Sequence, residues 1–223
     1  MDTKILPVVP QEATPQSPQD KWKEEARISF RRARVIRNYE NLWECILALY
    51  NGFKVLKSPR TEPLIMEIVN FLKSVARSLP QKEYNRRETF LLFYFIGDLL
   101  SDCRDYESAH YCLDKALQMN PNDEDVYYSK AWVYKETNDR DRAIEYFEKT
   151  VGINPAHVRS WAMLGYFYRL SNKFSKAKQC YERYLLFTGE DDPDEKGRRD
   201  IARKWIPCLN RKIELFGEEL RFL

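Results

Sequence analysis

The feature that most constrains the fold of this chain is an outline of residues that returns every 34 positions. It occurs as RDYESAHYCLDKALQMNP at 104–121, as NDRDRAIEYFEKTVGINP at 138–155 and as NKFSKAKQCYERYLLFTG at 172–189. Ala109, Ala143 and Ala177 hold the same place in the three stretches, and apolar residues surround each of them at helical spacing. The spacing predicts an array of similar helical units.

Each unit is expected to contain two antiparallel helices joined by a tight turn. The turns are SDCRDYES at 101–108, KETNDRDR at 135–142 and RLSNKFSK at 169–176, and their Asp and Asn residues can cap the second helix. Asn-Pro at 120–121 and 154–155 ends one unit and begins the next. Small residues let two helices cross closely. The predicted crossing pairs are Gly97 with Ala109, Ala131 with Ala143, and Gly165 with Ala177.

This combination resembles the tetratricopeptide repeat family, whose unit has a W-x2-L-G-x2-Y motif followed by A-x3-F and then A and P. WAMLGYFYRL at 161–170 matches the first part, and AIEYFEKTVGINP at 143–155 matches most of the second. The resemblance implies an all-α, right-handed superhelix of antiparallel helix pairs. The implied repeats are 88–121, 122–155 and 156–189.

Three departures from the family pattern carry their own expectations. Lys130 replaces a large aliphatic residue, so the second unit is expected to pack less tightly or to extend the amine to a surface. Tyr184 replaces a small residue and Gly189 replaces proline, as expected where an array ends. Residues 190–223 are therefore predicted to form a capping helix that begins at Asp192 and Pro193. Pro207 is expected to kink it or to begin a second helix.

The N-terminal part lacks the 34-residue register. Residues 1–20 are rich in proline and are expected to be disordered. The apolar segment ILPVVP at 5–10 is a candidate either to occupy a binding groove of the repeats or to dock to another protein. Residues 21–87 are predicted to be a helical section, with Pro63 opening one of its helices. Whether this section includes a degenerate repeat stays open.

Composition weighs against catalysis and against a membrane or secreted protein. The formal charge is only +3, there are two histidines, and the chain has no G-x-x-x-x-G-K-[ST], G-x-S-x-G or H-E-x-x-H motif. Its five cysteines form no C-x-x-C pair, its start lacks the pattern of a signal peptide, and its apolar runs are too short to span a bilayer. We expect a non-enzymatic, cytoplasmic protein in a reducing compartment, without a cofactor or metal.

The resemblance implies that the first helices of the repeats line a concave groove for a partner segment. The positions that correspond to this face are Leu91, Tyr94, Phe95, Asp98, Asp102, Asp125, Tyr128, Ser129, Trp132, Glu136, Arg159, Ala162, Met163, Tyr166 and Arg169. The residues predicted to bind the partner are Tyr94, Phe95, Asp98, Tyr128, Trp132, Tyr166, Arg159 and Arg169. The family's carboxylate clamp is missing, because Tyr94 and Asp98 stand where its Lys and Asn begin.

The predicted function is an adaptor, assembly factor or chaperone that acts as a scaffold for another protein. Its partner is expected to be an extended or helical segment with apolar anchors, and with basic residues near the first units. In the alternative interpretation, some of these aromatic residues pack against the N-terminal helices. A rival function is binding of nucleic acid or an anionic surface through the basic segment 21–37, which contains RISFRRARVIR. Self-association stays open.

Overall fold

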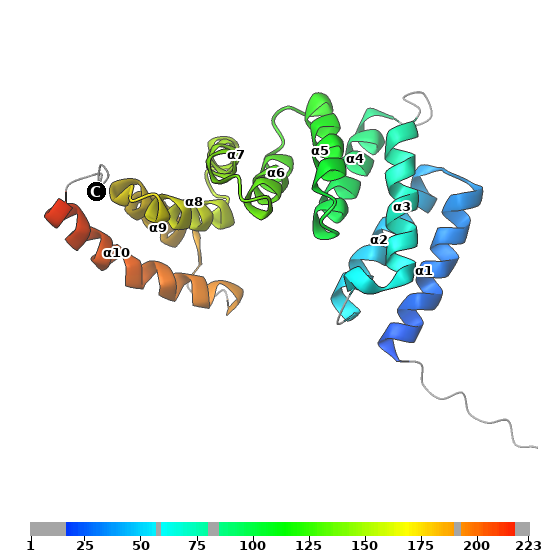
Figure 1. Cartoon of the computed structure of the whole chain (residues 1–223), viewed down its shortest axis with the longest axis horizontal. Helices are drawn as coiled ribbons and strands as arrows, with labels where there is room; N and C mark the ends of the chain where they lie inside the picture. The colour runs from blue at the N-terminus through cyan, green and yellow to red at the C-terminus, as the bar shows by residue number, and fades with distance from the viewer. Residues whose placement is uncertain (1–16, 57–58, 80–84, 190–192, 217–223) are drawn as a thin grey trace, which may run out of the picture. The chain divides into compact units, whose positions relative to one another are not determined.

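The computed structural model describes residues 17–56, 59–79, 85–189 and 193–216. The chain divides into two compact units, Met1–Pro80 and Gln81–Leu223. The described residues form ten α-helices and two short 3-10 helices (Figure 1). The predicted all-α fold class is confirmed, whereas the domain limits expected from the sequence stay predictions. The tail with ILPVVP lies outside the described residues.

The first unit is built from α1 (Pro18–Val35), α2 (Tyr39–Val55), the 3-10 helix η1 (Pro59–Thr61) and α3 (Pro63–Ser78). Pro63 occupies the first turn of α3, as predicted. Trp22 joins α1 to α2, since its Nε1 atom donates a hydrogen bond to the carbonyl of Ala48 over 2.6 Å. A Cβ atom added to Gly52 would approach the same indole ring to 2.6 Å. The absence of a side chain at Gly52 therefore lets the two helices meet.

The second unit contains three successive helix pairs, whose members lie side by side (Figure 1). The pairs are α4 (Arg86–Asp102) with α5 (Tyr106–Met119), α6 (Glu124–Glu136) with α7 (Arg140–Ile153), and α8 (Val158–Leu170) with α9 (Phe174–Phe187). The apolar faces of each pair are buried against each other, and Phe147, Phe174 and Leu92 are among the largest fully buried side chains. The helices and pairing expected from the repeated outline are thus present.

The turn inside each pair has the same backbone conformation. Arg104, Asn138 and Asn172 have φ angles of 64°, 62° and 58°. The next residue then donates its N–H back across the helix end, as Asp139 does to the Tyr134 carbonyl over 2.9 Å. Asn tolerates this left-handed conformation better than most residues, which explains its recurrence.

Capping follows the prediction in two of the three pairs. The Asp105 side chain accepts a hydrogen bond from the Ser108 N–H at the start of α5, and Asp139 does the same for Arg142 in α7. In the third pair Lys173 stands at the N-cap and makes no side-chain capping bond.

The small residues at the crossings are buried, but their nearest neighbours differ from those predicted. A Cβ atom added to Gly97 would lie 3.0 Å from Leu113, and one added to Gly165 would lie 2.7 Å from Tyr181. These large neighbours lie one helical turn beyond the alanines expected to face the glycines. The small residues therefore make room for a large side chain on the second helix as well as for its backbone.

Lys130 occupies the aliphatic position of the second repeat and is 2% exposed. Its ammonium group forms an ion pair with Asp114 and lies 5.1 Å from the centre of the Tyr146 ring. The expectation of an amine at the surface is therefore wrong. A carboxylate on α5 and a tyrosine on α7 satisfy the charge inside the array instead.

The array ends at a 3-10 helix, η2 (Pro193–Glu195), followed by α10 (Lys196–Phe216), which packs on α9. The fully buried Tyr184 donates a hydrogen bond to Glu195 Oε2 over 2.9 Å, and Arg199 Nη1 donates to the Gly189 carbonyl over 2.6 Å. Tyr184 and Gly189, the two departures from the repeat pattern, thus both form hydrogen bonds with the terminal segment. Asp192 lies outside the described residues.

The helix α10 runs without interruption past Pro207 to Phe216, so no second helix begins at that proline. The expected first turn also differs, because Pro193 belongs to the 3-10 helix. Of the helices in the described ranges, none combines the length and apolar character that a bilayer span requires.

Two glycines in the repeats test the packing argument. Gly165→Ala places a methyl group 2.7 Å from the buried Tyr181 ring, and we expect it to lower the free energy of unfolding by about 1 to 2 kcal/mol. Gly152→Ala is the control, since nothing lies within 4 Å of its added Cβ. In that helix alanine should raise stability by about 1 kcal/mol. Denaturant unfolding followed by circular dichroism measures both, and equal effects would contradict the crossing model.

Candidate functional site

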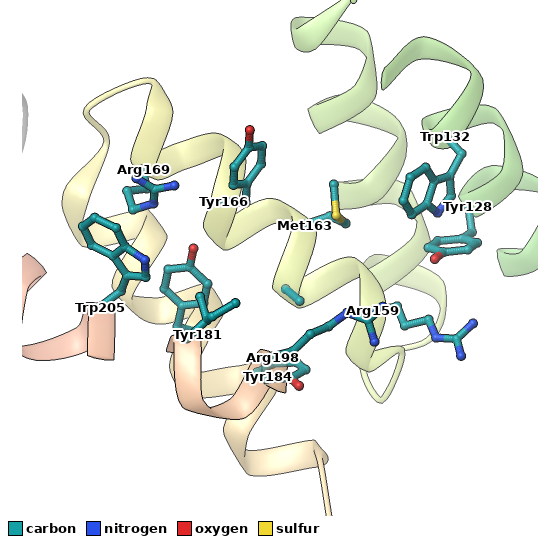
Figure 2. Close-up of a pocket in the computed structure, with 12 residues that line it drawn as sticks. Tyr128, Trp132, Arg159, Met163, Tyr166, Arg169, Tyr181, Tyr184, Arg198 and Trp205 are labelled. Carbon is teal, nitrogen blue, oxygen red and sulfur yellow. The ribbon is translucent and has the colours of Figure 1, made fainter. Parts of the chain in front are cut away.

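A pocket of about 280 Å³ opens on the second unit, between helices of the last two repeats and the terminal helix (Figure 2). Its walls come from α6, α8, α9 and α10. Most of its lining is aromatic or aliphatic, and three arginines complete it. The lining residues are Tyr128, Trp132, Arg159, Ala162, Met163, Tyr166, Arg169, Tyr181, Tyr184, Arg198, Ile201 and Trp205.

The structure brings together five of the eight residues predicted to bind a partner. These are Tyr128, Trp132, Arg159, Tyr166 and Arg169, all on first helices of the second and third repeats. Ala162 and Met163, which the sequence places on the same face, also line the pocket. Trp132 and Tyr166 hold equivalent places in successive repeats, so stacking of the repeats brings them to one surface.

The other three predicted residues, Tyr94, Phe95 and Asp98, lie on α4 outside this pocket. The Tyr94 and Phe95 ring centres are 4.8 Å apart. The Asp98 carboxylate accepts a hydrogen bond from Ser129 Oγ of α6 over 2.9 Å. This α4 face is therefore a separate, more acidic part of the predicted surface.

The aromatic wall on the α6 side is held by contacts among its own rings. Tyr128 lies edge-on to Trp132 with ring centres 6.1 Å apart, and its ring is 4.7 Å from that of His157. Lys135 lies 4.0 Å from the Trp132 ring centre. These contacts hold the two rings in place before any ligand arrives.

Arg169 lies at the opposite wall, between rings from two elements (Figure 2). Its guanidinium carbon is 4.1 Å from the Trp205 ring centre on α10 and 5.5 Å from that of Tyr166 on α8. Its Nε atom is buried and has no hydrogen-bond acceptor within the described part of the chain. A buried donor of this kind is a place where a ligand's oxygen atom gains a bond.

Arg159 and Arg198 lie at the α6 end of the pocket and share one carboxylate. The Oε1 atom of Glu195 is 3.8 Å from Arg159 Nε and 2.8 Å from Arg198 Nη1. The Glu195 side chain is almost fully buried, whereas both arginines are exposed. The hydrogen bond to Glu195 raises the pKa of Arg198 further, so its positive charge is secure.

The sequence analysis missed the contribution of α9 and α10. Tyr181, Tyr184, Arg198, Ile201 and Trp205 line the pocket, yet residues 190–223 were predicted only to cap the array. The sequence signal for this contribution was Tyr184. A large side chain at a position that is small in the other repeats implies that something other than another repeat packs there. Sequence alone did not indicate that this neighbour also lines a pocket.

Burial keeps the tyrosines of this surface neutral. It is the main cause that raises the pKa of Tyr128, Tyr181 and Tyr94, and for Tyr94 the nearby Asp98 adds to the effect. Burial and the hydrogen bond to Glu195 raise the pKa of Tyr184 to about 12. These side chains therefore act as apolar rings with a polar hydroxyl at one end.

The structure assigns structural roles to groups that a catalytic hypothesis would need. His157 is the N-cap of α8, where its Nδ1 atom accepts a hydrogen bond from the Ser160 N–H over 3.3 Å. Burial raises the pKa of the Cys45 thiol to about 11 and that of Cys180 to about 12, so neither is a ready nucleophile. In the described ranges no group of three His, Cys, Asp or Glu side chains is arranged to hold a metal ion.

The basic segment 21–37 forms most of α1, and several of its charges have partners within the first unit. Lys23 pairs with Glu62 over 3.1 Å and Arg32 with Glu44 over 3.3 Å. Arg34 lies over the Phe30 ring. Arg27 and Arg31 are exposed on the same helix.

A comparison with protein-family models now identifies the repeats. The model described as tetratricopeptide repeat matches residues 92–123, 124–157 and 158–187. The chain is a tetratricopeptide repeat protein. The resemblance noted in the sequence is confirmed, and each matched segment contains one of the helix pairs of the second unit or most of it. Repeats of this type form protein-interaction scaffolds and are not themselves catalytic.

Curated relatives match this chain over part of their length. The chain is 27% identical over 131 residues to human protein O-mannosyl-transferase TMTC1, covering 57% of this chain and 14% of that protein. It is also 27% identical over 125 residues to the chloroplastic tetratricopeptide repeat domain-containing protein PYG7 of Arabidopsis thaliana, covering 54% and 39%. The chain thus spans well under two thirds of either relative.

Solved structures share the fold at low sequence identity. A crystal structure of MamA superimposes with a TM-score of 0.58 at 20% identity, covering 77% of this chain and 95% of that one. MamA from Desulfovibrio magneticus RS-1 gives a TM-score of 0.56 at 17% identity, covering 79% and 98%. These likenesses support the helix-pair architecture and say nothing about ligands.

The hydrogen bond from Tyr184 should contribute to docking of α10. Tyr184→Phe removes a buried donor to the Glu195 carboxylate, and we expect a loss of about 1 to 2 kcal/mol in the free energy of unfolding. Tyr111→Phe, which alters a partly exposed ring on α5, should change stability by less than about 0.5 kcal/mol. Denaturant titration measures the free energy of unfolding of both variants. Equal losses would contradict a role of the Tyr184 hydrogen bond in docking α10.

His157 should make stability depend on pH below neutrality. Burial lowers its pKa below the ordinary 6.5, so its stabilising effect is fully present above pH 6.5 and is lost as the pH falls from there through the lowered pKa. His157→Asn keeps a capping side chain that does not titrate. We expect the variant to lose less stability than the wild type between pH 7.5 and about 5.5, measured by denaturant unfolding.

The matching control concerns His110, whose pKa burial also lowers. His110→Asn should remove a second share of the pH dependence, and the double variant should have the flattest profile. A His157→Asn profile parallel to that of the wild type would contradict the assignment.

Proposed function

We propose that this protein is a non-catalytic interaction module, an adaptor, assembly factor or chaperone, that binds a segment of a partner protein on the face of its first helices. The observation that carries the proposal is the pocket in which Tyr128, Trp132, Tyr166 and Arg169 meet Trp205 of α10. Tyr, Trp and Arg are the residues that most often dominate binding energy at interfaces.

The arrangement of these side chains favours binding over a purely structural role. Tyr166 is 42% exposed although its ring lies in the middle of an apolar surface. Rigid rings that are already positioned lose little conformational entropy on binding. The groove-facing residues on α4, Tyr94, Phe95 and Asp98, extend the proposed surface beyond the pocket and are part of the proposal.

The enzymatic name of one relative is not transferred to this chain. The matched part is only 14% of protein O-mannosyl-transferase TMTC1. Both histidines of the chain pack among helices, His157 as a cap and His110 with its ring 4.5 Å from that of Tyr134. These placements support a scaffold without its own chemistry.

We further propose that the protein works in a reducing compartment such as the cytoplasm. The five cysteines of the chain form no C-x-x-C pair, and Cys45, Cys112 and Cys180 are buried among the helices. Cysteines that serve as small buried side chains are typical of proteins kept under reducing conditions.

Binding of nucleic acid or of an anionic surface through α1 is the alternative function. The exposed guanidinium groups of Arg27 and Arg31 support it, whereas the ion pairs of Lys23 and Arg32 weaken it. Binding of this kind falls steeply with salt.

Capture of partners from nuclease-treated lysate tests the proposal with two matched variants. Tyr166→Ala removes a pocket ring, and Tyr111→Ala removes a tyrosine of equal exposure, 42%, on α5 outside the pocket. We expect Tyr166→Ala to reduce recovery of at least one protein by about tenfold or more, the effect of a hot-spot ring, and Tyr111→Ala to leave it unchanged.

Circular dichroism establishes that both variants keep the helical content of the wild type. Equal recovery by all three proteins would contradict a groove-binding function. A partner that appears only without nuclease, and disappears as salt is raised, would support the alternative on α1 instead.

A further inference from the structure

The pocket on the second unit has an uneven charge that restricts the class of segment it binds. None of the twelve side chains that line it is acidic, whereas three are arginines. Glu195, just outside the lining, neutralises one of these charges, because Arg159 and Arg198 share its Oε1 atom. Among the described residues, about two positive charges therefore stand over an aromatic floor without a lining carboxylate to balance them.

Among these arginines, Arg169 restricts the chemistry of a ligand most. The rings of Trp205 and Tyr166 lie on it at 4.1 and 5.5 Å, and its Nε donor is buried without an acceptor in the described residues. Stacking holds the planar group in place, and Tyr181 forms a hydrogen bond with it, but neither contact satisfies the Nε donor. An incoming carboxylate would accept from this group and offset a desolvation cost that the free protein already bears.

The surface formed by α4 and the start of α6 carries the opposite, negative charge. Asp98 lies against Ser129, and Asp125 lies close enough to Asp123 and Glu124 that these acids, after burial, raise its pKa. Asp98 and Asp125 also raise the pKa of Tyr94. A ligand that covers both regions needs a different charge at each end.

We propose that the pocket binds an acidic, apolar stretch of a partner protein, in which a large apolar side chain enters among the rings and a neighbouring Asp or Glu pairs with Arg169. This inference rests on the proposed groove function and specifies its ligand. The volume of about 280 Å³ suits one or two side chains of a bound segment. Side chains flanking the anchor then meet Arg159 and Arg198 at the other end.

The same charges disfavour a nucleic acid strand in this pocket. Aromatic rings and arginines also suit stacked bases and phosphates. A phosphate backbone, however, carries negative charge along its whole length and would continue toward Asp125, Asp123 and Glu124 on α6. A peptide is able to change sign within a few residues, which the two regions require.

The acidic ligand is tested with three synthetic peptides that have blocked ends and the same Trp-Leu anchor. The probe is DEWLDE, the amide control is NQWLNQ and the basic control is KKWLKK. Isothermal titration calorimetry on the full chain at low salt measures their affinities. We expect DEWLDE to bind at least about tenfold more tightly than NQWLNQ, and KKWLKK to bind more weakly than either.

Protein variants then locate the effect. Arg169→Gln should weaken DEWLDE by about tenfold or more and change NQWLNQ by less than about threefold, because only the first peptide supplies a carboxylate. Arg183→Gln, which removes an exposed charge of α9 outside the pocket, should leave both affinities unchanged. Trp205→Ala should weaken both peptides, since it removes part of the apolar wall.

Several results would overturn the inference. These are equal binding of DEWLDE and NQWLNQ, loss of DEWLDE binding in Arg183→Gln, and displacement of DEWLDE by a short oligothymidylate or by inorganic phosphate at similar concentration. Failure of every peptide to bind, while Tyr166→Ala still loses a captured partner, would reject the acidic ligand and leave the groove function standing. If Tyr166→Ala also captures every partner as well as the wild type does, both proposals fail.

Discussion

The close crossing of two helices within each repeat is the contact on which the rest of this structure depends. Gly97 and Gly165 leave room for Leu113 and Tyr181, and Ala131 holds the equivalent place in the second repeat. A larger residue would push the helices apart, because the facing rings and aliphatic groups are already packed. Three such crossings at a constant interval place the first helices on one surface. The face proposed to bind a partner is thus a consequence of packing in the core.

The end of the array decides what that surface becomes. At an internal repeat the stacking position is small, as at Ala116 and Thr150, so that the next helix pair can approach. Tyr184 fills this space and bonds Glu195, and α10 then lies against α9 instead of a fourth repeat. The terminal helix brings Trp205 and Arg198 to the face of α8. A residue that breaks the repeat pattern therefore helps to position the terminal helix, which lines one side of the pocket.

Each buried or stacked cation of the second unit has a defined neighbour. Lys130 has Asp114 and Tyr146, and Arg198 has Glu195. Arg169 has the ring of Trp205 and a hydrogen bond with Tyr181, but its buried Nε donor has no acceptor in the described residues. This difference separates a charge that stabilises the array from one suited to a ligand.

The sequence by itself determined the helix pairs, the repeat interval, the end of the array near Tyr184 and seven of the twelve pocket residues. It could do so because these depend on helical periodicity and on the size of side chains at fixed intervals. It misjudged the Lys130 amine and the first turn of the terminal helix, and it missed the role of Trp205. Those features were decided by the tertiary structure alone. They depend on which side chains from distant segments meet, and short-range periodicity does not contain that information.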